Sequence, residues 1–300
     1  MSSAEQTDEM DEVCANCGKV AVDDVQLKKC GGCELVKYCS VDCQKNHRPK
    51  HKKACKQRAA EIRDDELFAQ PDVSCYGECP ICCLPLPLDK SKSSMNTCCC
   101  KLICLGCDWA NKKREDEAGQ DHHKCPFCRE PLPKTREEAH SNYMKRIKAN
   151  DPMALCQMGG KHYHKGDYEG AFQYYTKAAE LGDMDGHYKV SCLFYEGEGV
   201  AKDHKMFMYH LEIAAIGGHH IARHNLGAYE YRNKRIGRAM QHWIIAANLG
   251  YDDALERVKK GFQRGWVSKD DYAAALRGHQ AAVDATKSQQ REEAYKEEIY

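Results

Sequence analysis

The sequence predicts a mainly α protein, in which an α-solenoid of helical-hairpin repeats is preceded by two small, cysteine-rich α+β modules. Two observations support this fold class. The chain has 300 residues and 20 cysteines, and all the cysteines except Cys156 and Cys192 lie between Cys14 and Cys128. After about Thr135 the composition shifts to Ala, Tyr, Leu, Gly and His with helical periodicity. A chain of 300 residues is also long enough to form two or three domains.

The cysteines are expected to bind metal rather than to form disulfides. The first twelve residues are acidic and polar, unlike a secretory signal peptide. No apolar run approaches the roughly 18 residues of a membrane span. These features predict a cytoplasmic or nuclear protein, where thiols stay reduced and clustered cysteines are typical metal ligands. The formal net charge of zero disfavours both nucleic acid and a membrane surface as partners.

Changes in composition and helix-breaking prolines divide the chain into seven segments. Gln70-Pro71 limits a helix that precedes it, and the stretch from Glu130 to Pro133 marks the next boundary. The expected segments are a disordered acidic leader at 1–13, a first cysteine module at 14–58, a helical linker at 59–74, a second cysteine module at 75–133, a connecting helix at 134–150, repeats at 151–286 and a charged tail at 287–300.

The first module contains four pairs of ligand candidates, enough for two tetrahedral zinc sites. The pairs are Cys14/Cys17, Cys30/Cys33, Cys39/Cys43 and His51/Cys55. The module resembles a MYND-type zinc finger over its whole length. That resemblance implies that alternate pairs share an ion, so that Cys14, Cys17, Cys39 and Cys43 hold one zinc and Cys30, Cys33, His51 and Cys55 hold the other. His47, one turn before His51, is a rival ligand.

The same resemblance implies a partner, since MYND fingers usually bind short proline-containing peptides of other proteins. Seven Lys or Arg residues and no acid lie between Gln44 and Arg58. A solvated helix face explains this run better than contact with phosphate, which is the alternative. The module is therefore expected to bind protein and not nucleic acid.

The second module begins and ends with matching Cys-Pro-x-Cys knuckles. These are Cys79/Cys82 and Cys125/Cys128, and between them lie the triplet Cys98–Cys99–Cys100 and the pair Cys104/Cys107. The module resembles a RING-type finger, which implies a cross-brace: Cys79, Cys82, Cys104 and Cys107 hold one zinc, and Cys98, Cys99, Cys125 and Cys128 hold the other. It departs from that family because Lys101 occupies the place of the usual histidine. Cys100, His122 and His123 are alternative ligands, and Cys75 is an alternative partner of Cys79.

The RING resemblance also implies a docking surface for a ubiquitin-conjugating enzyme. Its candidates are Ile81 between the first two ligands, Trp109 beyond the sixth, Pro126 in the last knuckle and Arg129 after the eighth. Ordinary packing or solvation accounts for each of these residues equally well.

The third region is a repeat of helix, loop, helix and short turn. Ala154, Gly186, Ala222 and Ala254 open the copies, and an alanine pair in the second helix follows 24, 28 and 24 residues after the first three openings. The four extra residues of the second copy fit in its glycine-rich loop near Gly197. The repeats resemble Sel1-like repeats over about 151–286, with a weaker fourth copy. This family forms α-solenoids that hold partner proteins.

The sequence as a whole predicts a zinc-binding intracellular adaptor with about four zinc ions per chain. Complete protein ligand sets leave no place for a catalytic water, and no catalytic residues are predicted. The alternative is a RING-type ubiquitin ligase that uses the repeats to select substrates.

Overall fold

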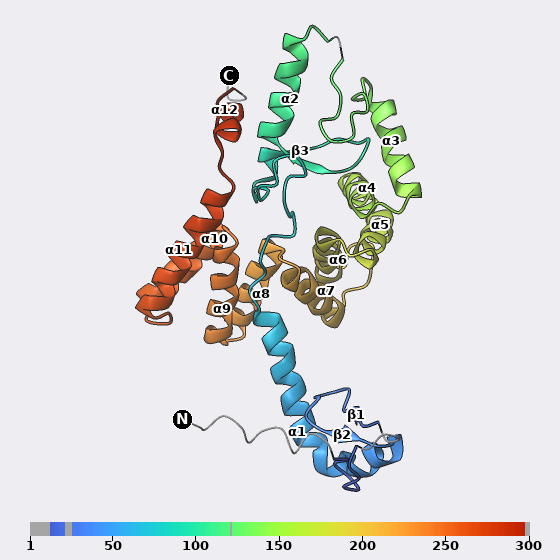
Figure 1. Cartoon of the computed structure of the whole chain (residues 1–300), viewed down its shortest axis with the longest axis vertical. Helices are drawn as coiled ribbons and strands as arrows, with labels where there is room; N and C mark the ends of the chain where they lie inside the picture. The colour runs from blue at the N-terminus through green and yellow to red at the C-terminus, as the bar shows by residue number, and fades with distance from the viewer. Residues whose placement is uncertain (1–12, 22–25, 121, 298–300) are drawn as a thin grey trace. The chain divides into compact units, whose positions relative to one another are not determined.

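A computed structural model of the chain describes residues 13–21, 26–120 and 122–297 (Figure 1). The chain forms two compact units, Met1–Ala69 and Gln70–Tyr300. The expected leader at 1–13 lies outside the described residues except for Val13, and so do the last three residues of the tail. None of the helices in the described ranges combines the length and apolar character that crossing a membrane needs.

The first unit is a small sheet followed by one long helix. Strands β1 (Lys28–Lys29) and β2 (Lys37–Tyr38) pair antiparallel, and helix α1 follows at Val41–Phe68. The hydroxyl of Ser40 caps α1 by accepting a hydrogen bond from the Cys43 N–H at 3.2 Å. Apart from Tyr38, the buried cluster of this unit consists of the cysteines Cys14, Cys30 and Cys33. Its core therefore depends on what those sulfurs bind.

The second cysteine module opens the second unit. It contains a short 3₁₀ helix η2 (Lys90–Lys92), the antiparallel strands β3 (Ser93–Met95) and β4 (Leu102–Cys104), and helix α2 (Leu105–Glu117). Leu86 and Ile103 are buried among the cysteines of its core. This module is again small, and sulfur atoms fill much of its interior.

The rest of the second unit is a series of stacked helical hairpins, which confirms the predicted fold class (Figure 1). Hairpins α4/α5, α6/α7 and α8/α9 follow one another, and α10 and α11 pack on α9. The helices are α3 (Arg136–Lys148), α4 (Pro152–His164), α5 (Tyr168–Glu180), α6 (Met184–Glu196), α7 (His204–Ile216), α8 (His220–Arg232), α9 (Ile236–Asn248), α10 (Asp252–Gln263), α11 (Lys269–Ala285) and α12 (Gln289–Glu297).

The length variation between repeats is confined to one loop. Residues 197–203 join α6 to α7, whereas 165–167 and 233–235 make the corresponding connections in the other two hairpins. Gly199 in the long loop has φ +68°, and a Cβ there would lie 2.2 Å from the carbonyl oxygen of Tyr168. The loop therefore needs glycine both for its backbone conformation and for its close approach to α5.

The second module and the repeats pack together, although they were expected as separate domains. Lys90 forms an ion pair with Asp185 at the start of α6 at 3.0 Å. The Cys75 N–H donates to the carbonyl oxygen of Gly218 at 3.1 Å, and the Tyr76 ring lies edge-on to His220. These contacts between residues far apart in sequence account for the single compact unit at 70–300.

Four histidines of the repeats are buried, and the pKa of three of them is lowered. Burial lowers the pKa of His210 to about 4 and the pKa values of His220 and His242 to about 3. An unfolded histidine titrates near 6.5, so below that pH the unfolded chain binds protons that the folded chain does not. We expect the stability of the repeats to fall as the pH drops from about 6.5 towards 4.

Hydrogen exchange of α8 and α9 between pH 7 and pH 5, corrected for intrinsic exchange, measures this loss. Metal analysis at each pH separates it from zinc release, and His242→Gln should flatten the pH profile. A profile that is level in the wild type contradicts the prediction.

Candidate metal centres

Four groups of potential metal ligands lie in the described parts of the chain, two in each cysteine module. Within each group, the ligand atoms all lie within 4.8 Å of one another. The groups are Cys14, Cys17, Cys39 and Cys43; Cys30, Cys33, His51 and Cys55; Cys79, Cys82, Cys104 and Cys107; and Cys98, Cys99, Cys125 and Cys128. The structure thus brings together the same four sets that the two family resemblances imply.

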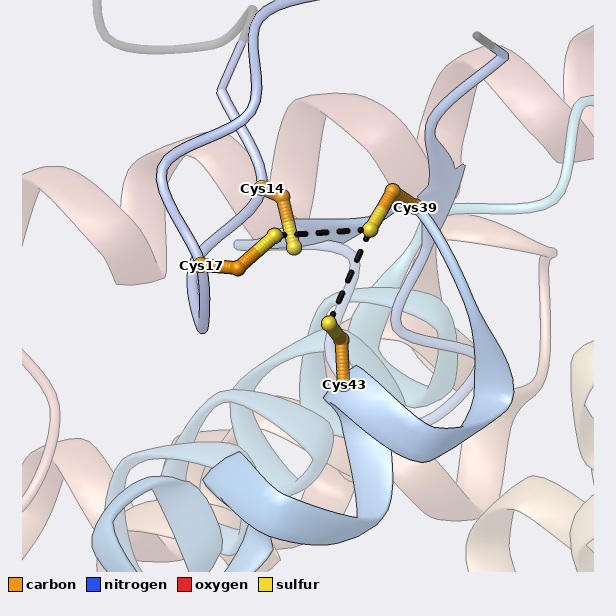
Figure 2. Close-up of side chains that lie close together, drawn as sticks. All are labelled: Cys14, Cys17, Cys39 and Cys43. Atoms are coloured by element: carbon orange, nitrogen blue, oxygen red, sulfur yellow. Dashed lines mark hydrogen bonds between the residues drawn. The ribbon is translucent and has the colours of Figure 1, made fainter.

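The first group is assembled from three short segments (Figure 2). Cys14 and Cys17 lie in a tight turn closed by the hydrogen bond from the Gly18 N–H to the Cys14 carbonyl oxygen at 2.8 Å. Cys39 follows β2, and Cys43 lies in the first turn of α1. The Cys39 sulfur is 3.5 Å from that of Cys17 and 3.6 Å from that of Cys43.

These separations are those of a tetrahedral zinc site. Zn–S bonds of about 2.3 Å at tetrahedral angles place sulfur atoms about 3.8 Å apart. The Cys30–Cys55, Cys82–Cys104 and Cys99–Cys125 sulfur pairs are each separated by 3.8 Å, and Cys98–Cys128 by 3.3 Å. All four donor sets are therefore the right size for the ion.

His51, and not His47, joins the second group. Its Nε2 lies 3.1 Å from the Cys33 sulfur, and the residue is 8% exposed. Nδ1 of His47 instead lies 3.0 Å from the Tyr38 hydroxyl, and its ring stacks on His51. His47 thus packs against the ring of His51, and His51 is the histidine that belongs to the second group.

The local environment in the first module lowers the pKa of some cysteines and raises that of others. Burial opposes ionisation of Cys30, but hydrogen bonds from the Gly32 backbone, His51, Cys33 and Cys55 lower its pKa to about 6. Cys14 behaves in the same way, with hydrogen bonds that outweigh burial and a pKa of about 6. In the same two clusters, the hydrogen bond with Cys17 raises the pKa of Cys39 to about 12, and burial raises the pKa of Cys55 to about 11. Each cluster of the first module therefore contains one thiol that loses its proton readily and one that keeps it until a metal ion binds.

The structure separates the three members of the cysteine triplet. Cys98 and Cys99 lie in the fourth group, whereas Cys100 has φ +53° and its thiol points to the carbonyl oxygen of Thr97 at 3.8 Å. Cys75 and Cys83 also lie outside the groups. Of the alternative histidines, His122 contacts the Lys134 amine, and His123 lies 3.5 Å from Glu115.

The donor sets fit zinc. Three groups offer four thiols and one offers three thiols and an imidazole, which are the soft, tetrahedral sets that select zinc. Four protein ligands fill the coordination sphere in each case, which is typical of structural rather than catalytic zinc. The protein therefore has zinc as its cofactor.

The four residues expected to dock a conjugating enzyme have different surroundings. Ile81 is 42% exposed, and Trp109 is half-buried in the second turn of α2 with the Lys113 amine 4.8 Å from its ring centre. Pro126 is half-buried. Arg129 donates to Asn111 Oδ1 at 2.7 Å and to Glu115 Oε1 at 3.0 Å.

Glu115 is a residue that the sequence analysis missed. It is 1% exposed, and besides binding Arg129 it accepts hydrogen bonds from the Lys124 N–H at 3.0 Å and from Asn111 Nδ2 at 3.1 Å. It therefore ties α2 to the knuckle that carries Cys125. No sequence signal distinguishes Glu115 from the other charged residues of α2, because its role depends on the fold.

Comparison with known proteins identifies the first module. The MYND finger family model matches residues 14–55, which confirms the MYND finger predicted from the ligand spacing. Two curated relatives are each 36% identical to this chain, over 52 and 55 residues. Both are described as "Putative beta-lactamase HcpC", and each comes from a different strain of Helicobacter pylori. These matches cover 17% and 18% of this chain, and the chain spans less than a fifth of the length of either relative.

Two solved structures are similar to part of this chain. A Sel1 repeat protein from Oxalobacter formigenes is 22% identical, with 60% of this chain and 74% of that chain covered and a TM-score of 0.44. The protective antigen c5321 of uropathogenic Escherichia coli, described as having an SLR fold, is 20% identical over 55% of this chain and 37% of that chain, with a TM-score of 0.39. This chain therefore contains a MYND finger, and its second unit contains stacked helical hairpins.

Proposed function

We propose that this protein is a zinc-dependent adaptor that joins two protein partners. The MYND finger would bind a short proline-containing peptide, and the unit of residues 70–300 would bind the second partner. The observation that carries this proposal is the division into two compact units, of which the first contains a MYND finger and the second contains stacked helical hairpins. The four complete donor sets support a structural role for the metal in both units.

The proposal includes a ligand assignment. Each of the four groups would hold one zinc ion, through the sixteen side chains named above, so that the loaded chain carries four. The cross-braced order of the third and fourth groups supports a RING-like finger at residues 75–133. Metal analysis of the purified chain tests the count, and two zinc ions instead of four would restrict the assignment to the MYND finger.

A cavity of about 500 Å³ in the second unit is a candidate site for the second partner. Its lining includes the apolar side chains of Leu86, Leu249 and Val283. Four carboxylates also line it, and they outnumber its one lysine, Lys92: Asp72, Asp89, Asp252 and Asp253. This charge balance favours a peptide segment with an aliphatic anchor flanked by Lys or Arg.

Neutralising two carboxylates of this cavity should weaken the second interaction selectively. Exposed ion pairs contribute about 0.2–1 kcal/mol each, so Asp252→Asn with Asp253→Asn should weaken binding of a basic peptide by about 2- to 30-fold. Fluorescence anisotropy with labelled peptides measures both interactions. The matched control is Glu169→Gln with Glu180→Gln on α5, which removes the same charge elsewhere.

The adaptor proposal predicts that the two peptides bind at the same time. A proline-containing peptide should bind the zinc-loaded chain and lose binding on His51→Ala, while the basic peptide stays bound. Displacement of one peptide by the other, or failure of both to bind the zinc-loaded chain at millimolar concentration, contradicts the adaptor.

A ubiquitin ligase is the second candidate. The observation that favours it is the exposure of Ile81 between two members of the third sulfur group, with Trp109 two residues beyond a third member of that group. Autoubiquitination with a panel of conjugating enzymes tests it, and activity lost on Ile81→Ala would establish the ligase. Arg129→Ala is less selective, because Arg129 also holds α2. No activity from the fully zinc-loaded chain rejects this candidate.

A further inference from the structure

The C-terminal helix packs on the second cysteine module, although the sequence suggested only a charged tail there. Helix α12 contacts α2, and Ala294 and Arg291 on its inner face are 0% and 1% exposed. The approach is close, since a Cβ on Gly106 would lie 2.9 Å from the Arg291 Cα. Gln290 Nε2 also donates to the carbonyl oxygen of Gly106 at 2.8 Å.

The guanidinium of Arg291 reaches the third sulfur group. Nη2 donates to the Cys82 sulfur at 3.3 Å and to the Leu84 carbonyl oxygen at 3.2 Å. Nη1 donates to the carbonyl oxygens of Pro85 and Thr286, each at 2.7 Å. The same side chain therefore binds the loop after the first knuckle, the turn before α12 and a sulfur of the cluster.

The charge of Arg291 needs an explanation. A buried cation is costly unless an opposite charge accompanies it, and carbonyl oxygens carry only partial charges. Among the described residues, no carboxylate forms an ion pair with Arg291, and the group that it touches is the sulfur cluster. A zinc ion with four thiolates carries a net negative charge, which is the counter-charge that this guanidinium lacks.

We propose that Arg291 is an outer-sphere positioning residue of the zinc site formed by Cys79, Cys82, Cys104 and Cys107, and that it couples zinc binding to docking of α12. This inference rests on the proposed ligand assignment. Outer-sphere hydrogen bonds orient ligands and commonly change metal affinity by about 10- to 100-fold. By linkage, zinc in the site strengthens docking of α12, and docked α12 strengthens zinc binding by the same factor.

Arginine suits this position better than lysine. The planar guanidinium directs several N–H donors along fixed directions, and here two nitrogens donate to four acceptors on two segments of the chain. A lysine ammonium supplies the charge without that planar arrangement of donors, whereas glutamine supplies donors without the charge. Arg291→Lys and Arg291→Gln therefore separate the two contributions.

Zinc release from the full-length, zinc-loaded chain tests the coupling. With a chromogenic chelator in excess, Arg291→Gln should release one of the four zinc ions about 10- to 100-fold faster than the wild type, and Arg291→Lys should lie between them. The other three ions provide an internal reference. Arg277→Gln, at an exposed position on α11, removes the same charge and should release zinc as the wild type does.

Cobalt substitution adds a measurement that a purely structural role would not change. Loss of an N–H···S bond raises electron density on the Cys82 sulfur, so the thiolate-to-cobalt absorption of Arg291→Gln should shift to longer wavelength. Limited proteolysis of the wild type should also cut α12 faster after zinc removal. This measurement needs no variant, so it remains informative if a substitution prevents folding.

The outcomes separate the coupling from the ligand assignment. Four zinc ions in the wild type, with wild-type release kinetics and an unshifted cobalt spectrum in Arg291→Gln, overturn the coupling and leave the assignment intact. Only two zinc ions in the wild type overturn the assignment itself, and the inference with it.

Discussion

Chelating zinc from the full chain is expected to unfold residues 14–55 and to leave helices α4–α11 folded. The buried cluster of the first unit is Cys14, Cys30, Cys33 and Tyr38, so little apolar core remains once the sulfurs lose their common ion. Structural zinc contributes about 10–16 kcal/mol to domains of this kind. Domains this small rarely fold without metal or disulfides.

The repeats should resist the same treatment because they bury apolar side chains of their own. Leu155, Leu193, Leu226 and Val258 are each at most 1% exposed in successive repeats, and none belongs to a metal group. Hydrogen exchange with mass spectrometry resolves the two units. After chelation, amides near Cys33 should exchange at the rate of an unfolded chain, while those of α5 and α9 keep their protection.

Cysteine substitutions provide a matched control for chelation. Cys33→Ser should unfold the MYND finger in the presence of zinc, whereas Cys83→Ser changes an exposed cysteine outside the groups and should leave zinc content and exchange unaltered. Unchanged circular dichroism and exchange after complete zinc removal contradicts the prediction.

The zinc groups and the repeat helices were predictable from sequence because their signals are local. A two-residue spacing orients two sulfurs in one knuckle, and the alanine pairs recur at nearly constant intervals. The choice within the cysteine triplet was not predictable to the same degree. It depends on the backbone at Cys100, whose positive φ turns that thiol away from the site.

The docking of α12 was not predictable at all. Its sequence, Gln-Gln-Arg-Glu-Glu-Ala-Tyr-Lys-Glu, has only Ala294 and Tyr295 as apolar or aromatic residues and is typical of a solvated segment. The contact that buries Arg291 joins residues 209 positions apart. The partner of Arg291 can be identified only in the folded chain, where the repeats place α12 next to the second module.

In the first three repeats, the sizes of the residues at two corresponding positions of the hairpin are matched. The residue five positions after the opening residue is Gly159, Ser191 and Gly227 in the first three copies. Three residues before the alanine pairs, the second helices carry Tyr175, Leu211 and Trp243 in the same order. Glycine thus accompanies an aromatic ring, and serine accompanies leucine. A Cβ at Gly159 would lie 2.7 Å from the Tyr175 ring, and one at Gly227 would lie 2.5 Å from Trp243 Nε1.

Transplanting the second pair into the third repeat should therefore show strong coupling. Gly227→Ser alone forces a side chain against a Trp243 ring that is 3% exposed and fixed by its hydrogen bond to the His224 carbonyl oxygen at 3.1 Å. Overpacking of this kind costs about 1–3 kcal/mol. Trp243→Leu alone leaves a cavity, with a cost below the roughly 3–5 kcal/mol of a Trp→Ala change.

The double variant Gly227→Ser/Trp243→Leu should be less destabilised than the sum of the two single variants, because the smaller leucine leaves room for the serine side chain. Contacting residues commonly couple by about 0.5–3 kcal/mol, and here the coupling should be favourable. Hydrogen exchange of α9 in the zinc-loaded chain measures the stability of the wild type, the two single variants and the double variant. Gly237→Ala in the same helix meets no atom within 4 Å and should stabilise α9 by up to about 1 kcal/mol. Strict additivity of the two substitutions would show that the paired sizes arise from the separate environments of the helices rather than from their contact.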